Sequence, residues 1–402
     1  MSRARSQLLF LVHEPPLMDH YREIWKKLDK SKFVIGLHQR MDSGSGSFDP
    51  DYTRYRDEIG KSGYQVMEVS RLLSSNIKFR WVISNHKMGK ADSPKTVSKF
   101  VRTVLARVAR SLLGRSREGS PGERVVRALS GPVWMPQKLG KVQIRMMYGA
   151  DLSPAWSLQD WNQMYSHVLC HGPRDSELVS QKFTARCYQI GYPKYDRYFS
   201  DRTGLSSLRR EFGLAPEGKV VLWLPTVGKN SLDDFLDLMT GLAGRYQIIC
   251  RPHPLSLKSQ WRSVENLRNG GITIDEYASR EMVELMATAD YLMTDSGGSP
   301  FGGLYLNMKV IRMVGPATVQ NELDQNSTND ALRLLYPAIS PADSLDTVTR
   351  LFEDEDRWND MLLKARPVRE EFFGPYDGVS AGRAITVLEQ ITQLKLRVDE
   401  VA

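Results

Sequence analysis

A cation and an imidazole stand close together after one apolar segment in the second half of the chain. Arg251 and His253, each followed by a proline, come directly after residues 246–250, which we predict to form a β-strand. Ligands of open parallel sheets bind at the carboxyl ends of the strands. A guanidinium recognises phosphate oxygens through paired hydrogen bonds, and an imidazole stabilises or protonates a leaving phosphate. The pair therefore predicts contact with a pyrophosphate, although a lone histidine is more often structural.

A glycine-rich turn follows another predicted strand, over residues 291–294. The turn consists of Asp295, Ser296, Gly297, Gly298 and Ser299, and a helix is expected to begin near its last residue. Small residues let backbone amides approach a ligand, and the first turn of a helix attracts anions. We predict an anion site, with both serines donating to phosphate oxygens and Asp295 either holding the loop or accepting from a ribose or base. A plain turn with a helix cap explains the same residues equally well.

The elements around these turns alternate between strand and helix. Thr226 follows the apolar segment 219–225 and is the third candidate beside a strand end. Further strands are expected at 246–250, 272–274, 291–294 and 309–313, with helices at 205–212, 231–242 and 280–287. In the first half we expect strands at 8–12, 33–38, 143–148, 167–170 and 186–190, a helix at 21–28, and a last helix over 381–398. This rhythm predicts an α/β fold with doubly wound parallel sheets.

Composition limits the class of protein. A chain of 402 residues with 41% hydrophobic and 25% charged residues is long enough for two globular domains. Its three cysteines, Cys170, Cys187 and Cys250, have no metal-ligand spacing and suit a reducing compartment, so we expect a cytoplasmic protein. The apolar run 8–12 ends too early for a signal peptide, and no stretch reaches the roughly 18 apolar residues of a membrane span.

A basic stretch covers residues 95–117. It contains seven Lys or Arg residues and no Asp or Glu, and valine and leucine recur within it at helical spacing. This pattern predicts a basic amphipathic helix that lies on an anionic membrane surface. Alternatively, the apolar stripe packs on the protein's own core and the charges form a solvated face. Nucleic acid is not expected as a partner, because the stretch has no interleaved aromatic residues.

Five motifs occur in the order that is typical of one known family. They are GYPKYD at 191–196, LPT at 224–226, RPHP at 251–254, the block from Ala289 to Ile311 around TDSGGS, and YDGVSAGR at 376–383. This set resembles the CDP-glycerol glycerophosphotransferases that build teichoic acids and related capsule polymers. The resemblance implies a GT-B fold, with two Rossmann-like domains facing across a cleft. We expect an acceptor domain over 1–200, a donor-nucleotide domain over 201–385 and a C-terminal helix over 386–402.

The resemblance also implies roles for individual residues. His253 is expected to contact the donor phosphate or act as general acid, and Arg251, Ser296 and Ser299 to contact the pyrophosphate. The family's general base is the histidine of a His-Gly pair, but the corresponding position here is Tyr148, before Gly149. Tyrosine, with a pKa of about 10, is a poor base at neutral pH. Asp151 and His171 are therefore further candidates, and the choice of base stays open.

The expected function is transfer of a polyol phosphate, such as glycerol phosphate, from a CDP-linked donor. The acceptor would be a membrane-associated or lipid-linked glycan, and the protein would be peripheral on the inner face of the cell membrane. No metal and no cofactor beyond the CDP- or CMP-linked substrate is expected. One alternative is a GT-B glycosyltransferase that uses a CMP-sugar of the Kdo or sialic acid type, with Asp151 as base. Another is a catalytically weakened protein that binds nucleotide or glycan as a partner.

Overall fold

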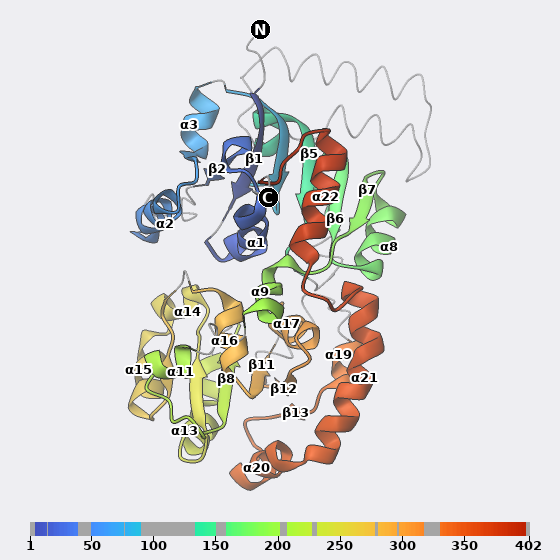
Figure 1. Cartoon of the computed structure of the whole chain (residues 1–402). Helices are drawn as coiled ribbons and strands as arrows, with labels where there is room; N and C mark the ends of the chain where they lie inside the picture. The colour runs from blue at the N-terminus through green and yellow to red at the C-terminus, as the bar shows by residue number, and fades with distance from the viewer. Residues whose placement is uncertain are drawn as a thin grey trace, which may run out of the picture.

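The computed structural model describes residues 5–13, 15–38, 50–75, 77–89, 133–149, 158–201, 207–226, 231–277, 280–295, 297–316 and 330–398. These residues form two parallel β-sheets in two lobes that lie one above the other (Figure 1). The predicted α/β class is confirmed. The basic stretch 95–117 and Asp151 lie outside the described residues, as does Ser296.

The first lobe contains a seven-stranded sheet among the described residues, in the order β3-β2-β1-β4-β5-β6-β7. Its strands are β1 (Arg5–Val12), β2 (Phe33–Leu37), β3 (Val66–Glu68), β4 (Phe79–Ser84), β5 (Gly140–Met146), β6 (His167–Cys170) and β7 (Arg186–Gln189). Its helices are η1 (Pro15–Met18), α1 (Asp19–Lys27), η2 (Lys30–Lys32), α2 (Pro50–Lys61), α3 (Val69–Ser74), α6 (Met135–Leu139), η3 (Asp160–Met164) and α8 (Pro173–Lys182).

Alternating side chains bury both faces of this sheet. Leu8, Phe10 and Val12 of β1 pack into one cluster with α1, whereas Leu9 and Leu11 pack into another with α3. Successive residues of a strand point to opposite faces, so a run of apolar residues is stable only where helices cover both sides. The continuous apolar segment 8–12 is therefore placed at the centre of the sheet, between β2 and β4.

The second lobe contains a six-stranded sheet in the described part of the chain, in the order β10-β9-β8-β11-β12-β13. Its strands are β8 (Val220–Leu224), β9 (Gln247–Cys250), β10 (Thr273–Ile274), β11 (Tyr291–Thr294), β12 (Lys309–Met313) and β13 (Ala338–Ile339). Its helices are α11 (Leu208–Glu211), α12 (Ser231–Asp234), α13 (Leu236–Leu242), α14 (Pro254–Ser259), α15 (Trp261–Asn269), α16 (Met282–Thr288), α17 (Ser299–Tyr305), α19 (Asp330–Leu335), α20 (Leu345–Glu353) and α21 (Glu355–Phe373).

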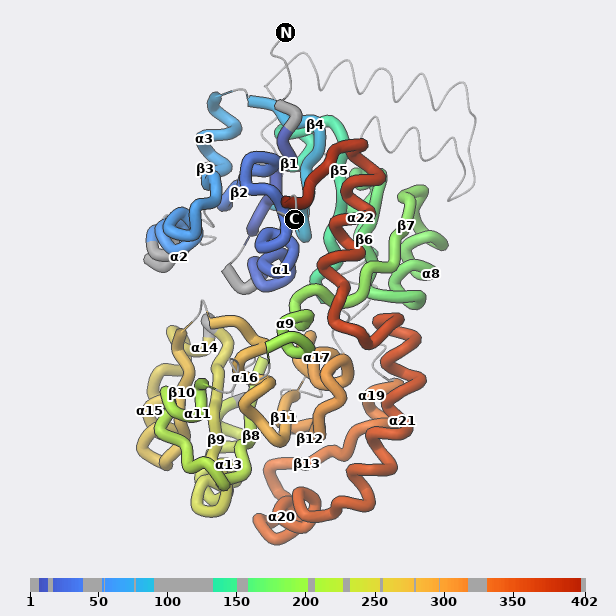
Figure 2. Tube along the Cα trace, viewed as in Figure 1, coloured from blue at the N-terminus to red at the C-terminus, as the bar shows by residue number. Residues whose placement is uncertain are grey.

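Two segments join the lobes. Elements η4 (Pro193–Tyr195) and α9 (Arg197–Ser200) lead down to the second lobe, and α22 (Ser380–Thr392) carries the chain back up. The tube in Figure 2 shows α22 alongside the first sheet, where Ala384 and Leu388 join the same core cluster as α1. The first lobe is thus completed by the end of the chain.

Every predicted strand is present, with ends displaced by at most a few residues. The last helix was predicted too long, because α22 ends at Thr392 and the residues described after it, 393–398, are not helical. Gln393 adopts a left-handed conformation that ends α22, and Arg397 then pairs with Leu28 in an isolated bridge. The helix expected at 231–242 is interrupted at Phe235, and α14 and α15 were not predicted. The domain boundary near residue 200 stays a prediction.

Candidate functional site

The strand order of the second sheet places the predicted motifs at one edge. From β8 the chain moves outward through β9 and β10, and then returns to the other side of β8 with β11, so β8 and β11 are neighbours. The place where the strand order reverses, here between β8 and β11, is called the switch point of the sheet. In open α/β sheets, ligands usually bind in the crevice beyond the carboxyl ends of the strands at this point. Thr226 follows β8, Arg251 follows β9, and the turn from Asp295 to Ser299 follows β11. We refer to these positions together with His253 as the second-lobe strand ends.

Asp295 holds the loop after β8. Its carboxylate is 8% exposed and accepts from the amide of Thr226 at 3.0 and 3.1 Å, one distance for each oxygen. Gly297 has a φ of +78°, and a Cβ there would lie 3.4 Å from the Thr226 methyl group. Of the two roles predicted for Asp295, the geometry supports that of holding the loop. Gly298 faces open space, and Ser299 begins α17.

Arg251 is fixed by the second lobe. One Nη atom donates to the carbonyl of Arg280 at 2.9 Å and lies 3.7 Å from an Asp275 carboxylate oxygen. The side chain of Arg251 is 14% exposed, so its charge is oriented but not fully enclosed. His253 is exposed, and its carbonyl accepts from the amides of Ser256 and Leu257 at the start of α14. A cation with a fixed direction beside an exposed imidazole suits a phosphate group.

A second cation, Lys194, lies between the lobes. Burial lowers the pKa of Lys194 in η4, Asp19 of the first lobe opposes this shift, and Arg251 of the second lobe adds to it. On the first-lobe side, Asp19 accepts from the amide of Met282 at 3.2 Å, which ties α1 to α16. Lys194 therefore lies within electrostatic reach of both lobes. In the sequence, Lys194 was noted only as part of the GYPKYD motif at 191–196.

The first sheet has its own switch point, between β1 and β4. Three histidines that each follow a strand end gather there: His13, His38 and His86, which we call the imidazole cluster. The rings of His13 and His86 are stacked at 4.6 Å, and those of His13 and His38 are 5.1 Å apart. Burial, assisted by neighbouring charges, lowers the pKa of His86 to about 3, so this ring is neutral at physiological pH. Sequence reasoning missed the cluster, although the position of each histidine after a strand was a usable signal.

Comparison with known proteins decides the family. Residues 153–388 match the family described as CDP-Glycerol:Poly(glycerophosphate) glycerophosphotransferase, which is more than half of the chain. The chain belongs to this glycerophosphotransferase family. The predicted family and transferase class are thereby confirmed.

The sequence identity between this chain and a curated relative is low. A teichoic acid glycerol-phosphate primase of Bacillus spizizenii (strain ATCC 23059 / NRRL B-14472 / W23) is 22% identical over 129 residues, which are 31% of this chain and 32% of the primase. The match thus spans about a third of that relative's length.

Solved structures support the fold. The wall teichoic acid polymerase TagF is similar with a TM-score of 0.61 at 14% identity, over 97% of this chain and 90% of that chain. A UDP-GlcNAc 2-epimerase from Neisseria meningitidis, solved with UDP-GlcNAc, reaches a TM-score of 0.53 at 12% identity, over 96% of this chain and all of the other. At such identities the likeness concerns the fold, and it confirms the predicted pair of GT-B-type Rossmann-like domains.

Two of the family motifs of this glycerophosphotransferase, GYPKYD and YDGVSAGR, are joined by hydrogen bonds at the lobe boundary. Asp196 of GYPKYD accepts from the amides of Ser380 and Ala381 at 3.1 and 2.6 Å, which caps α22. The Tyr192 amide donates to the Ser380 hydroxyl at 3.0 Å. A side chain at Gly191, whose φ is +86°, would collide with the same hydroxyl. These contacts between the two motifs therefore fix the backbone of the linker against the start of α22.

The predicted bases lie in different surroundings. Tyr148 follows β5 and is half-buried, with its ring 6.2 Å from that of His20. His171 is 2% exposed, bonds through Nδ1 to Asp175 at 2.7 Å, and packs edge-on against Tyr192 at 4.5 Å. The Nδ1 atom of His171 is thus committed to Asp175, whereas its Nε2 atom has no hydrogen-bond partner. His20, at the start of α1, was not considered in the sequence analysis.

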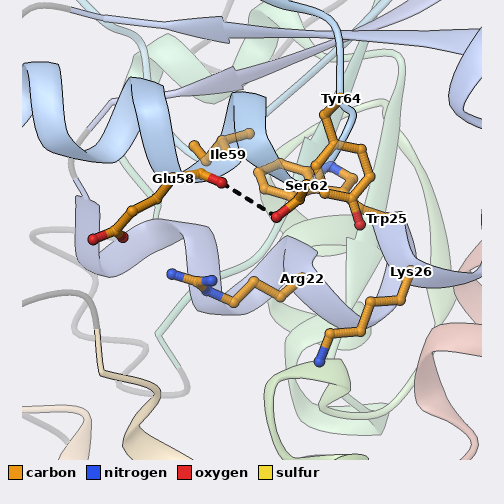
Figure 3. A pocket seen from close by; sticks show the side chains of 7 residues that line it. All are labelled: Arg22, Trp25, Lys26, Glu58, Ile59, Ser62 and Tyr64. Atoms are coloured by element: carbon orange, nitrogen blue, oxygen red, sulfur yellow. Dashed lines mark hydrogen bonds between the residues drawn. The ribbon is translucent and has the colours of Figure 1, made fainter.

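One pocket of the first lobe faces the region between the lobes (Figure 3). It measures about 160 Å³ and is lined by Arg22, Trp25, Lys26, Glu58, Ile59, Ser62 and Tyr64. Arg22 and Lys26 project from α1 on the same side, and the Glu58 carboxylate accepts from the Tyr277 hydroxyl of the second lobe at 3.4 Å. The pocket lies apart from the second-lobe strand ends.

Metal and membrane features were sought in the same part of the chain. Within the described ranges, no three His, Cys, Asp or Glu side chains are arranged to hold a metal ion. None of the described helices is long and apolar enough to cross a bilayer.

Proposed function

We propose that the protein transfers a polyol phosphate, with glycerol phosphate as the first choice, from a CDP-linked donor to an acceptor in cell-surface polymer synthesis. The observation that carries this proposal is the meeting of Thr226, Arg251 and the 295–299 turn at the switch point of the lobe that lies within the family match. A teichoic acid glycerol-phosphate primase and the wall teichoic acid polymerase TagF, which are both similar to this chain, are in agreement with the proposal.

The donor diphosphate is proposed to bind at the second-lobe strand ends. Arg251, held by Asp275 and the Arg280 carbonyl, would receive the phosphate oxygens. His253 is exposed beside it and would stabilise or protonate the leaving CMP. Gly298 and Ser299, at the start of α17 after β11, would add hydrogen bonds. Lys194 would contribute a second positive charge from the lobe boundary.

The acceptor is proposed to bind at the switch point of the first sheet. The imidazole cluster marks this edge, and Arg145 lies close enough to lower the pKa of His86. The two edges belong to opposite lobes, so an acceptor hydroxyl would approach the donor phosphorus from the first-lobe side. Membrane association through 95–117 is part of the proposal, since family acceptors that are lipid-linked would bring the protein to the bilayer.

The direct test uses the purified full chain with CDP-glycerol and a lipid-linked glycan acceptor. We expect CMP release that depends on the acceptor, and stabilisation of the protein by CDP. At a CDP concentration 100 times the Kd the stabilisation is about 2.7 kcal/mol, which is readily seen as a shift in Tm. A CMP-sugar donor is assayed in parallel. If no pyrimidine nucleotide shifts the Tm and no CMP is released, the proposal is wrong.

Membrane association has a separate test. The triple variant Arg102→Gln, Arg107→Gln, Arg110→Gln is expected to lose most of its binding to vesicles that contain phosphatidylglycerol, because each basic residue near the surface contributes about 1 kcal/mol. Binding of CDP should be unchanged in this variant. A control variant with three neutralised residues of the second lobe, Arg268, Lys364 and Arg366, should bind vesicles as the wild type does. Equal sedimentation of the triple variant and the wild type would remove this part of the proposal.

A further inference from the structure

His20 is a buried imidazole with an unused nitrogen. It is the second residue of α1 and is 4% exposed. Its ring is stacked on Tyr192 at 5.9 Å with an interplanar angle of 25°, and it meets the edge of Tyr148 at 6.2 Å. Its Nδ1 atom has no hydrogen-bond partner. Buried polar atoms are normally paired, so an unpaired ring nitrogen held by aromatic contacts requires an explanation.

His20 lies at the boundary between the lobes. The preceding residue, Asp19, bonds to Met282 of the second lobe, so the start of α1 lies at the boundary between the lobes. Lys194 acts electrostatically on His20 and is itself acted on by Arg251. His20 is therefore on the first-lobe side of the place where the donor phosphates would meet Arg251. Tyr148, the residue that replaces the family's histidine, lies against the same ring.

We propose that His20 is the general base of the transfer reaction and that its Nδ1 accepts the proton of the acceptor hydroxyl. The inference rests on the proposed function. The acceptor oxygen forms a bond with the phosphorus of the polyol phosphate, and the bond from that phosphorus to the bridging oxygen of the CDP group breaks. CMP leaves with the bonding electrons, and the proton passes from the hydroxyl to His20 and then to solvent. An imidazole from α1 thus replaces the one that the resemblance leads us to expect at position 148.

The surroundings keep this imidazole ready to accept a proton. Burial, followed by the charge of Lys194 and by His171, holds the pKa of His20 well below its usual value, so the ring is neutral at physiological pH. The titratable groups around it are Asp19, Tyr148, His171, Tyr192 and Lys194. A bound diphosphate opposite Lys194 would offset that positive charge and raise the basicity of His20. The base would then become effective when the donor is present.

Three other imidazoles of the first lobe differ from His20 in their surroundings. His86 already accepts from the Met88 amide through Nδ1 at 3.2 Å. His171 is bonded to Asp175 through Nδ1 and is covered by Tyr192. His167 lies at the start of β6 and contacts Tyr188 at 3.2 Å. Among these rings, His20 combines an unpaired Nδ1 with a position next to Lys194.

The test separates chemistry from packing. His20→Phe keeps an aromatic ring against Tyr192 but has no nitrogen, and His20→Ala leaves space for added imidazole. We expect both variants to keep the Tm shift with CDP and to lose about 10²- to 10⁴-fold in kcat for acceptor-dependent CMP release. Free imidazole should restore part of the rate of His20→Ala, with a pH dependence that follows its ionisation. His167→Phe is the matched control and should turn over as the wild type does.

The outcomes distinguish this inference from the proposed function. A wild-type protein that releases no CMP from CDP-glycerol refutes the proposed function itself. An active wild type with a His20→Phe variant within tenfold of its kcat refutes only the assignment of His20. A loss of rate that imidazole does not restore in the folded His20→Ala variant also overturns the assignment, because a purely structural role predicts that result.

Discussion

Replacement of Arg251 by alanine is expected to lower kcat/KM for the CDP-linked donor by about 10²- to 10³-fold, which corresponds to about 3 to 4 kcal/mol of transition-state stabilisation. The guanidinium is held in advance by the Arg280 carbonyl and by Asp275, so little ordering is required when phosphate binds. The fold should survive, because Asp275 keeps its bond from Arg280 at 3.0 Å. Acceptor-dependent CMP release and the Tm shift with CDP are the two measurements.

Two further variants sharpen this prediction. Arg251→Lys keeps the positive charge but loses the planar pair of donors, so an intermediate loss would indicate recognition of two phosphate oxygens. Arg268→Ala removes an arginine of the same lobe that forms ion pairs with Glu265 and Glu276 on the surface. It should leave donor kinetics unchanged. If Arg251→Ala retained the wild-type Tm shift with CDP, Arg251 would not belong to the donor site.

The second large effect is expected at the lobe boundary. Asp196→Ala should lower the free energy of unfolding by about 2 to 4 kcal/mol, because it leaves the amides of Ser380 and Ala381 without acceptors. Both residues are fully buried, so water cannot replace the carboxylate. The urea midpoint of the purified chain measures the change. Asp360→Ala, on the exposed face of α21, removes an aspartate that pairs only at the surface with Lys364 and should cost less than about 0.5 kcal/mol.

The effect of Asp196 should also depend on pH. Burial is the largest influence and raises the pKa of this carboxyl to about 6, despite the hydrogen bonds that oppose it. Because the folded state then binds the proton more tightly than the unfolded state, the part of the stability that comes from this raised pKa is present below about pH 4 and is lost as the pH rises to about 6. The difference in unfolding free energy between wild type and Asp196→Ala should therefore be larger at pH 4.5 than at pH 7.5. An equal difference at both values would contradict the raised pKa.

Local signals in the sequence singled out the candidate residues at the second-lobe strand ends. Arg251, Asp295 and Thr226 were singled out because each follows an apolar run, and apolar runs of this length form buried parallel strands. The structure places all three at one edge of the sheet. The analysis could not decide between two roles for Asp295, because its partner, the Thr226 amide, lies 69 residues away in the chain.

The imidazole cluster of the first lobe was missed for a related reason. His13, His38 and His86 are adjacent only because β2, β1 and β4 are neighbours in the sheet, and strand order is not encoded in any single segment. His20 directly precedes the helix expected at 21–28 and was not among the predicted site residues. Its surroundings come from Tyr148 after β5 and from Tyr192 in the linker. The predicted bases were Tyr148, Asp151 and His171, and the contact between Tyr148 and His20 appears only in the folded chain.

The sequence by itself determined the α/β class, the positions of the strands, the residues that follow them and the membership of a transferase family. Hydrophobic periodicity and the chemistry of turns are local properties, and for that reason they can be read along the chain. Only the tertiary structure decided which strand ends meet, why GYPKYD and YDGVSAGR occur together, and which imidazole lies between the lobes. These features depend on the packing of segments that are distant in sequence, which is fixed by burial of their shared apolar surface and by the hydrogen bonds between them.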